Sequence, residues 1–274
     1  MALGLSKGLS QDTDKQFSNS WNQSSLEFDG SNDYIDLAGT ITTSLASTFL
    51  VEESNQVNMS FSAWVKGDTM NTTGVIFNLR VGTSSDNHII CMYHGSGNNL
   101  RFTAKFNGTA EVCVDGTLAS VATGGSFENA GWYHLVGTIS HGETQIDFWI
   151  NGTKVDSQNI AQALQGTVSK LTVGSNTSNG ALWNGKIDEF AIWDRVLSGT
   201  EITSLYNAKA VDGSGDAAIP FHQHPSLRDS LIVYLDAEDT SNSAKTVSLA
   251  DMKKYDLVNG VSYSNDVMWW ENML

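Results

Sequence analysis

Cysteine, proline and positive charge are all scarce in this sequence. Its 274 residues include two cysteines, two prolines and 15 Lys or Arg residues against 30 Asp or Glu residues, which gives a formal net charge of −15. Such a surface repels a phosphate backbone, so no nucleic-acid partner is expected, and anionic membrane is disfavoured for the same reason. The abundance of carboxylates instead favours divalent cations, which prefer oxygen ligands.

The two cysteines, Cys91 and Cys113, form no CxxC pair, which excludes a zinc knuckle. They fall on what the pattern predicts as consecutive strands, so a disulfide between them is geometrically open. Free buried thiols are the alternative, because an unpaired cysteine behaves as a small apolar residue.

Long apolar runs are absent as well. No stretch approaches the roughly 18 residues that a membrane-spanning helix needs, so no membrane insertion is expected. The first residues, MALGLSKGLSQDTDKQF, contain neither the apolar segment nor the cleavage site of a signal peptide. Synthesis in a cytoplasm without export is therefore the expectation.

Short strands are what the sequence has in abundance. NMSFSAWVKG, GVIFNLRV and TQIDFWINGTKV are apolar or alternate between apolar and polar residues, and clusters of Gly, Asn and Asp separate such segments. Asn151-Gly152 tolerates the positive φ of a type I′ turn and predicts a hairpin. With little helical periodicity, the pattern predicts an all-β fold, an antiparallel two-sheet jelly-roll sandwich.

Two boundaries divide the chain. Residues 1–22 are polar and rich in Gly and Ser, which is typical of an N-terminal arm. Both prolines fall in VDGSGDAAIPFHQHPS, which predicts the end of the jelly roll, residues 23–210, at that point. Just before it, a short helix is expected to begin with a capping box formed by Ser198 and Glu201.

The region 211–274 is then a linker and a small C-terminal appendage. Its tail ends in the Trp269-Trp270 pair. Tryptophan is enriched among the residues that dominate interface energies, so this pair predicts a docking segment. The alternative is that the appendage packs back onto the jelly roll.

Several segments together carry a family resemblance. LEFDGSNDYIDL, SFSAWVKG, GWYHLVGTISHGETQIDFWINGTKV, LTVGS and WNGKIDEFAIWDRVLSGTEITSLYN resemble the laminin-G-like, concanavalin-A-like jelly-roll superfamily, over roughly residues 25–207. The resemblance implies two curved antiparallel sheets with loops gathered at one rim. SLIVYLDAEDTSNSAKTVSLADMKKYDLVNGVSYSNDV is similar to a connector beside such domains in tailed-phage virion proteins, although Leu235 stands where that pattern has Trp.

The resemblance also implies one structural calcium ion at the rim of a sheet. The turn DGSND supplies Asp29, Asn32 and Asp33 as ligands, and Asp188 is the candidate that completes the shell. The alternative is that the turn carboxylates bond backbone amides as Asx residues. Glu189 is expected to face solvent, because adjacent strand residues point to opposite faces.

A sugar-binding site would use an exposed aromatic ring beside amide side chains. Trp183 is the candidate ring, and Asn176, Asn179 and Asn184 lie near it in sequence. The alternative is that Trp183 plugs the end of the sandwich.

No enzyme activity is expected. Glucanases of the superfamily resemble one another in an E-x-D-x-x-E strand whose carboxylates flank the scissile bond, and this chain lacks it. Asp188 and Glu189 are adjacent, so they are not expected to act together on one substrate. His134 lies in the WYHLV strand, where a structural role is the default.

Two functions from different classes remain. The first is a virion structural protein, a capsid-decorating or head- or tail-fibre component, whose lectin-like jelly roll binds cell-surface glycans weakly. Its partners would be capsid or other virion proteins, or further copies of the chain. The second is a secreted, extracellular carbohydrate-binding adhesin, which would need a leader for export.

Overall fold

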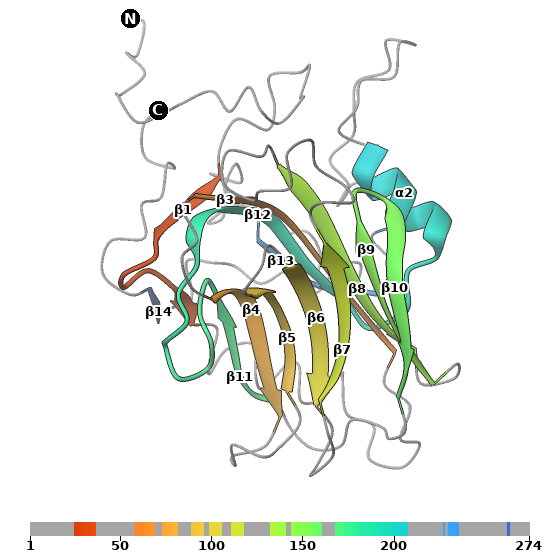
Figure 1. The fold of residues 1–274 in the computed structure, drawn as a ribbon, viewed down its shortest axis with the longest axis horizontal. Helices are drawn as coiled ribbons and strands as arrows, with labels where there is room; N and C mark the ends of the chain where they lie inside the picture. The colour runs from red at the N-terminus through yellow and green to blue at the C-terminus, as the bar shows by residue number, and fades with distance from the viewer. Residues whose placement is uncertain are drawn as a thin grey trace, which may run out of the picture.

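The computed structural model describes residues 25–36, 58–68, 73–81, 89–95, 99–105, 111–117, 132–140, 144–160, 168–207, 227, 230–235 and 262–263. Within these ranges the chain forms two seven-stranded antiparallel sheets and helix α2 (Gly199–Asn207). Figure 1 shows one sheet arching over the other. The predicted all-β, two-sheet jelly-roll sandwich is confirmed.

Sheet A has the strand order β1-β12-β3-β8-β9-β10, with β13 also paired to β12. Its strands are β1 (Leu26–Asp29), β3 (Met59–Gly67), β8 (Tyr133–Ser140), β9 (Gln145–Ile150), β10 (Thr153–Asn159), β12 (Asn184–Trp193) and β13 (Leu231–Leu235). The β9–β10 turn has positive φ at Asn151 (50°) and Gly152 (75°), which confirms the predicted type I′ hairpin.

Sheet B has the order β14-β2-β11-β4-β5-β6-β7. Its strands are β2 (Ile35–Asp36), β4 (Gly74–Val81), β5 (Ile89–Gly95), β6 (Asn99–Lys105), β7 (Val112–Thr117), β11 (Val168–Val173) and β14 (Ser262–Tyr263). The run β4-β5-β6-β7 is a simple meander. The register across it therefore aligns side chains from successive hairpins in rows.

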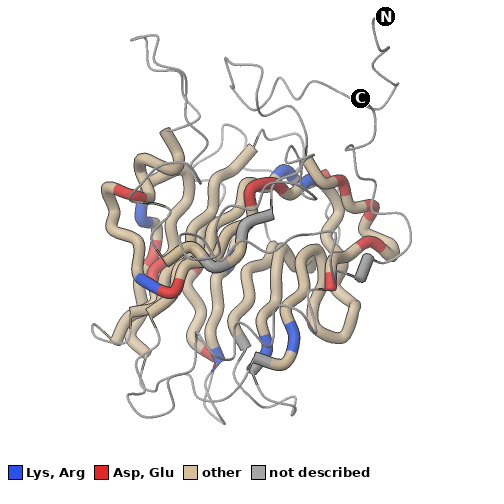
Figure 2. Tube along the Cα trace, turned by 180° about the vertical axis from the view of Figure 1, so that it is seen from behind, with Lys and Arg blue, Asp and Glu red and all other residues tan. Residues whose placement is uncertain are grey.

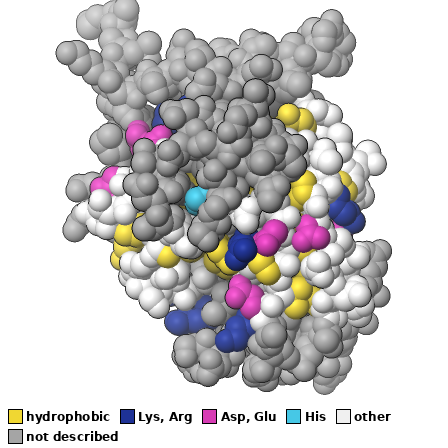
Figure 3. All heavy atoms as spheres, in the orientation of Figure 1, with side chains coloured by type: hydrophobic (Ala, Val, Ile, Leu, Met, Phe, Trp, Pro, Cys, Tyr) yellow, Lys and Arg dark blue, Asp and Glu magenta, His cyan; other side chains and the backbone are white. Residues whose placement is uncertain are grey.

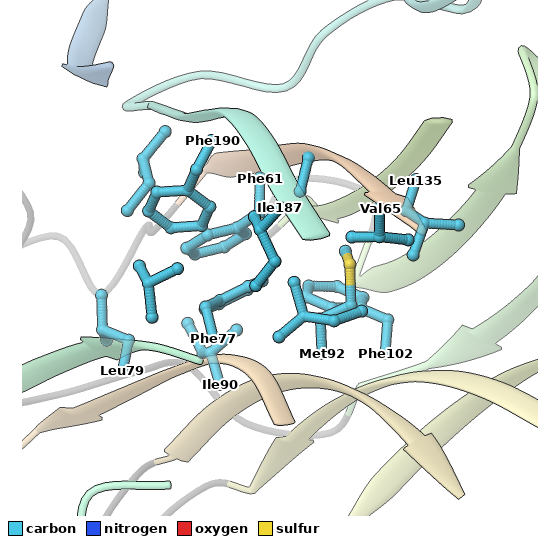
Figure 4. Close-up of a cluster of buried hydrophobic side chains, with 14 of the residues drawn as sticks. Phe61, Val65, Phe77, Leu79, Ile90, Met92, Phe102, Leu135, Ile187 and Phe190 are labelled. Carbon is cyan, nitrogen blue, oxygen red and sulfur yellow. The ribbon is translucent and has the colours of Figure 1, made fainter. Parts of the chain in front are cut away.

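The main core lies between the inner faces of the two sheets (Figure 4). Phe61 of β3 stacks on Phe77 of β4 across the sandwich, with ring centroids 4.9 Å apart. Phe190 of β12 approaches Phe77 from the same side, at 5.3 Å. Alternation along each strand sends these rings inward and leaves the neighbouring residues on the outer faces.

Helix α2 covers the outer face of sheet A. Its buried residues, Ile202 and Leu205, join a second apolar cluster with Val136, Ala191 and Trp193 of the sheet. No helix among the described residues is long and apolar enough to cross a membrane.

The predicted capping box is present at the start of α2. Ser198 Oγ accepts a hydrogen bond from the Glu201 N–H (3.3 Å), and the Ser198 N–H donates to Glu201 Oε2 (2.8 Å). Arg195 forms a bidentate ion pair with the same carboxylate, with nitrogen–oxygen distances of 3.0 and 2.6 Å. Burial raises the pKa of Glu201, but the hydrogen bonds from Arg195 and Ser198 outweigh it and lower the pKa to about 2.

This lowered pKa predicts a pH-dependent contribution of Glu201 to stability. A depressed carboxyl pKa stabilises the folded state above the unfolded pKa of about 4.5, and the contribution is lost as the pH falls towards 2. Because the pair is partly exposed, we expect Glu201→Gln to cost about 2 kcal/mol at pH 7 and close to nothing at pH 2. Urea denaturation of both proteins across this range measures the difference. A constant difference at all pH values would contradict the ion-pair origin.

Strand β13 belongs to the region that the sequence assigns to the C-terminal appendage. It pairs with β12 from Phe190↔Leu235 to Trp193↔Leu231, and Val233 is fully buried in the main core. The Trp193 indole N–H donates to the backbone oxygen of Leu227 (2.7 Å). This part of the appendage is therefore integrated into sheet A.

The other terminal predictions are not tested by these strands. The arm, residues 1–22, and the docking pair Trp269 and Trp270 lie outside the described residues. The limits 23–210 and 211–274 stay predictions as domain boundaries.

Candidate functional site

The predicted calcium ligands are not brought together. Asp29 Oδ1 accepts hydrogen bonds from the N–H groups of Ser31 (2.7 Å) and Asn32 (3.2 Å), and Asp33 Oδ2 accepts one from the Asp29 N–H (2.9 Å). These are the contacts of the Asx alternative. The turn carboxylates therefore act on their own backbone.

Asp188 lies well away from this turn. Asp29 is opposite Asn184 in the sheet register, and Asp188 is four residues further along β12, a separation of about 13 Å. Its Oδ1 accepts a hydrogen bond from the Glu189 N–H (2.8 Å). Among the described residues no group of three His, Cys, Asp or Glu side chains is placed to hold a metal ion. As a set, the four predicted ligands do not fit a calcium ion.

The expectation that Glu189 faces solvent is wrong. The side chain of Glu189 is 7 % exposed and that of Asp188 is 2 % exposed. The pairing of β12 with β3 shifts register between Asp188 and Ala191, and Glu189 has a φ of 49°. Such a bulge interrupts the alternation on which the expectation depended. The bulge also lies where the strand paired to the free edge of β12 changes from β1 to β13.

The predicted sugar-binding ring is not accessible. Trp183 is fully buried in the main core, so the alternative, in which it closes the end of the sandwich, is what the structure has. Asn176 organises the following turn by accepting hydrogen bonds from the N–H groups of Ser178 (2.9 Å) and Gly180 (2.8 Å). A buried ring cannot stack on a sugar, so the predicted set has no accessible aromatic ring.

The other two amides of the predicted set, Asn179 and Asn184, make contacts that do not involve Trp183. Asn179 is exposed; its amide donates to the Tyr34 hydroxyl (3.1 Å), and its Oδ1 accepts from Lys170 Nζ (2.9 Å). The backbone oxygen of Asn184 accepts from the Asp68 N–H (3.0 Å). Of the three amides, Asn179 is therefore the most exposed, and it lies beside sheet B.

His134 has the structural role that was expected of it. Its Nε2 is 2.9 Å from Ser62 Oγ, and its ring packs against Trp64 (5.1 Å between centroids) and Tyr206 of α2 (6.3 Å), which also stack on each other (5.9 Å). These contacts fix α2 on sheet A. The His134 imidazole therefore serves to pack α2 against the sheet.

The outer face of sheet B carries a row of hydrogen-bonding side chains, which the sequence patterns did not single out. The register places one residue from each of the adjacent strands β2, β11, β4, β5, β6 and β7 side by side. We call these residues the polar row: Asp36, Thr172, Asn78, Cys91, Thr103 and Cys113. Each alternates with inward apolar neighbours, and this alternation was the signal available in the sequence. Examples are Leu171-Thr172-Val173 of β11 and Phe102-Thr103-Ala104 of β6.

The middle of the polar row is buried. Thr172 is 0 % exposed, Asn78 and Cys91 are each 7 % exposed, and Thr103 is 1 % exposed. An outer sheet face usually presents such residues to water. Asn78 Oδ1 accepts no hydrogen bond from any residue that the structure describes, although it is buried. A buried oxygen of this kind has an unmet demand for a donor.

A charged chain lies beside the polar row, two residues along the strands. Tyr93, Arg101 and Asp115 are neighbours in register on β5, β6 and β7. The Arg101 Nε is 3.0 Å from Asp115 Oδ1, and a side-chain hydrogen bond links Arg101 with Tyr93. Burial raises the pKa of Tyr93, so its hydroxyl stays protonated at neutral pH. The chain offers an aromatic ring, a donor and an acceptor on one surface.

The two cysteines are free. Cys91 and Cys113 are not on consecutive strands, because Thr103 of β6 lies between them in register. Two strand spacings amount to about 9.6 Å, and a disulfide needs Cα atoms within about 7 Å. The disulfide alternative is therefore excluded by the fold.

We expect the Cys113 thiol to be unreactive in the native protein. Burial, together with the hydrogen bond that Cys113 donates to Asp115 (3.0 Å) and the charge of Asp115, raises its pKa to about 12. Since the thiolate is the nucleophile, alkylation by iodoacetamide at pH 8 should be at least about 100-fold slower than for free cysteine. Peptide mass spectrometry after timed labelling measures it, with denatured protein as the control. Equal rates in the native and denatured states would contradict this environment.

Comparison with known proteins assigns the fold to a family. The family model Laminin_G_3, described as the concanavalin A-like lectin/glucanases superfamily, matches residues 29–203. The chain belongs to this superfamily. No curated protein sequence matches it.

Solved structures share the fold at low sequence identity. The CBM40 module of the Ruminococcus gnavus IT-sialidase has a TM-score of 0.52 and 13 % identity over 66 % of this chain and 96 % of that chain. The same module bound to α2,3-sialyllactose has a TM-score of 0.51 and 11 % identity over the same shares. The K499G mutant of NanB sialidase from Streptococcus pneumoniae has a TM-score of 0.50 and 17 % identity over 66 % of this chain and 27 % of that chain.

Proposed function

We propose that this protein is a non-catalytic carbohydrate-binding jelly roll whose ligand lies across the outer face of sheet B. The observation that carries the proposal is the partly exposed Tyr93–Arg101–Asp115 chain on that face, with the buried polar row beside it. Saccharides present many hydroxyl groups, each of which both donates and accepts hydrogen bonds. The guanidinium and carboxylate of this chain, beside the ring and hydroxyl of Tyr93, match that demand.

The comparisons support this class of ligand. The CBM40 structures belong to a sialidase module that is named as carbohydrate-binding, and one of them holds α2,3-sialyllactose. That ligand is a property of the CBM40 module. Here it supports a saccharide over a peptide or nucleotide as the first class of ligand to test.

A glycan array tests the proposal. Purified protein should bind a subset of immobilised glycans, and Tyr93→Ala should reduce binding by at least about tenfold, since it removes the ring of the surface. Lys154→Ala is the matched control, because Lys154 lies on β10 of sheet A and pairs with Asp147 (2.6 Å). Absence of binding to every glycan, with folded protein, would sink the proposal. Equal losses in both variants would place the site elsewhere.

The protein is proposed to bind without turnover. The NanB match shows that this fold also occurs within sialidase chains, but it covers 27 % of that chain. Asp188 and Glu189 are buried at a bulge of sheet A, while the polar row lies on sheet B. Incubation of bound glycans with the protein, followed by chromatography, should show no products. Sustained cleavage that a single carboxylate substitution abolishes would overturn this part.

For its setting we propose a virion structural component that displays the jelly roll, made in a host cytoplasm. The support is the resemblance of residues 230–267 to a connector in tailed-phage virion proteins. The secreted adhesin is the alternative. Mass spectrometry of purified particles from the source distinguishes them: stoichiometric protein in the particles supports the virion, and protein only in the particle-free medium supports the adhesin.

A further inference from the structure

We infer that the saccharide carries a carboxylate or sulfate group and that Arg80 binds it. This inference rests on the proposed function and specifies its ligand. Arg80 lies on β4, two residues from Asn78 of the polar row, and faces the same side of sheet B. It is partly buried, and its Nε atom is buried without a hydrogen-bond acceptor. Among the described residues no carboxylate pairs with its guanidinium.

Two cations stand directly opposite each other at this position. Lys170 of β11 is the register partner of Arg80. Like charges that face each other across neighbouring strands destabilise a sheet unless an anion compensates them. Asp36 compensates Lys170, at 3.3 Å from its Nζ. Arg80 has no such partner among the residues that the structure describes, and we infer that an external anion compensates its charge.

The charges of the described residues make this position unusual. The structure describes eight Lys and Arg residues, and four of them lie on the outer face of sheet B: Arg80, Arg101, Lys105 and Lys170. The others, Lys66, Lys154, Lys186 and Arg195, lie on β3, β10, β12 and before α2. In a chain of net charge −15, half of the described cations are thus gathered on one face.

The figures show the same grouping. In Figure 2 the basic positions at the lower ends of the strands stand apart from most of the acidic ones, which lie higher. In Figure 3, Lys and Arg side chains are exposed on the lower part of the visible face, where Figure 1 shows the ends of the sheet B strands. Screening limits the reach of charge to about 8 Å at physiological ionic strength, so a bound anion responds to these cations more than to the distant carboxylates.

The carboxylates on this face do not cancel Arg80. Asp36 is paired with Lys170, and Asp115 with Arg101. Glu111 lies just before β7, which is three strand spacings, or about 14 Å, from β4 in the sheet. A planar guanidinium binds a carboxylate or sulfate through two parallel N–H···O bonds. The partly exposed Tyr93–Arg101–Asp115 chain on the same face then offers hydrogen bonds to the hydroxyls of the same saccharide.

Calorimetric titration with matched ligands tests the inference. α-1,4-Linked trigalacturonate and its fully methyl-esterified form share one skeleton and differ in charge, and a sulfated carrageenan tetrasaccharide supplies the other anion. We expect at least one anionic ligand to bind. If the anion is a carboxylate, the neutral ester should bind at least about tenfold more weakly than trigalacturonate. Arg80→Gln should lower the affinity for the anionic ligand by about 10–100-fold. Lys154→Gln is the control and should change nothing. Thermal melting confirms that both variants are folded.

The outcomes separate the inference from the function beneath it. Equal affinity for the ester and trigalacturonate, or for wild type and Arg80→Gln, overturns the anionic ligand while saccharide binding stands. Binding only of neutral glycans on the array does the same. If no glycan of either kind binds the folded protein, the proposed function fails and the inference falls with it. A loss that Lys154→Gln shares shows a general charge effect and also overturns the role of Arg80.

Discussion

Ending the chain after Ala210 is expected to abolish stable folding of the jelly roll. The removed region contains three buried side chains: Leu227 and Leu231 in the cluster beneath α2, and Val233 in the main core. Burial of one such side chain contributes about 1.5–3 kcal/mol, so their loss costs roughly 5–9 kcal/mol. A typical domain has only about 5–15 kcal/mol in total. The truncation also exposes the edge of β12 and leaves the Trp193 indole without its acceptor.

Circular dichroism and thermal melting of the truncated and full-length proteins measure this effect. A chain that ends after residue 240 is the matched control, because it keeps β13 in sheet A. We expect the control to fold and the shorter chain to be aggregated or unfolded. A truncated protein with an unchanged melting temperature would show that β13 contributes little, and that the region after Ala210 acts as an independent appendage.

Gly185→Ala is expected to destabilise the protein by more than about 3 kcal/mol. Gly185 lies at the start of β12 with a φ of 133°, which side-chain-bearing residues rarely adopt. A Cβ there would lie 2.2 Å from the Lys66 backbone oxygen and 2.9 Å from the Asp68 nitrogen. Both atoms belong to the backbone of the neighbouring strand end, so they cannot move aside as a flexible side chain would. The strain and the clash therefore act together.

Urea denaturation of Gly185→Ala beside Gly180→Ala checks this prediction. At Gly180 the nearest atom to a new Cβ would be Asn176 Nδ2, at 3.6 Å, which is an ordinary contact. We expect the control to change the free energy of unfolding by less than about 1 kcal/mol. Similar values for the two variants would mean that the β12–β3 edge adapts more freely than its register indicates.

The local features of this protein follow from short stretches of its sequence. Alternating and apolar runs predict the strands, Asn151-Gly152 predicts the hairpin, and Ser198 with Glu201 predicts the start of α2. These succeed because each depends on residues a few positions apart, whose backbone preferences do not need a partner from elsewhere in the chain. The inward rings of the core follow from the same alternation.

The candidate site, in contrast, was decided by the tertiary structure. Strand period predicts which residues share a face, but not which strands become neighbours, so it could not align Asn78 with Cys91 and Thr103 or set Arg80 opposite Lys170.

Burial and bulges were decided at the same level. Trp183 carries no local mark that distinguishes a ring exposed on a loop from one that closes a core. The bulge that buries Glu189 forms where β12 exchanges one neighbouring strand for another, and β13 joins sheet A across a sequence separation of about 40 residues. Each of these outcomes depends on contacts between distant segments, and such contacts exist only once the two sheets have packed together.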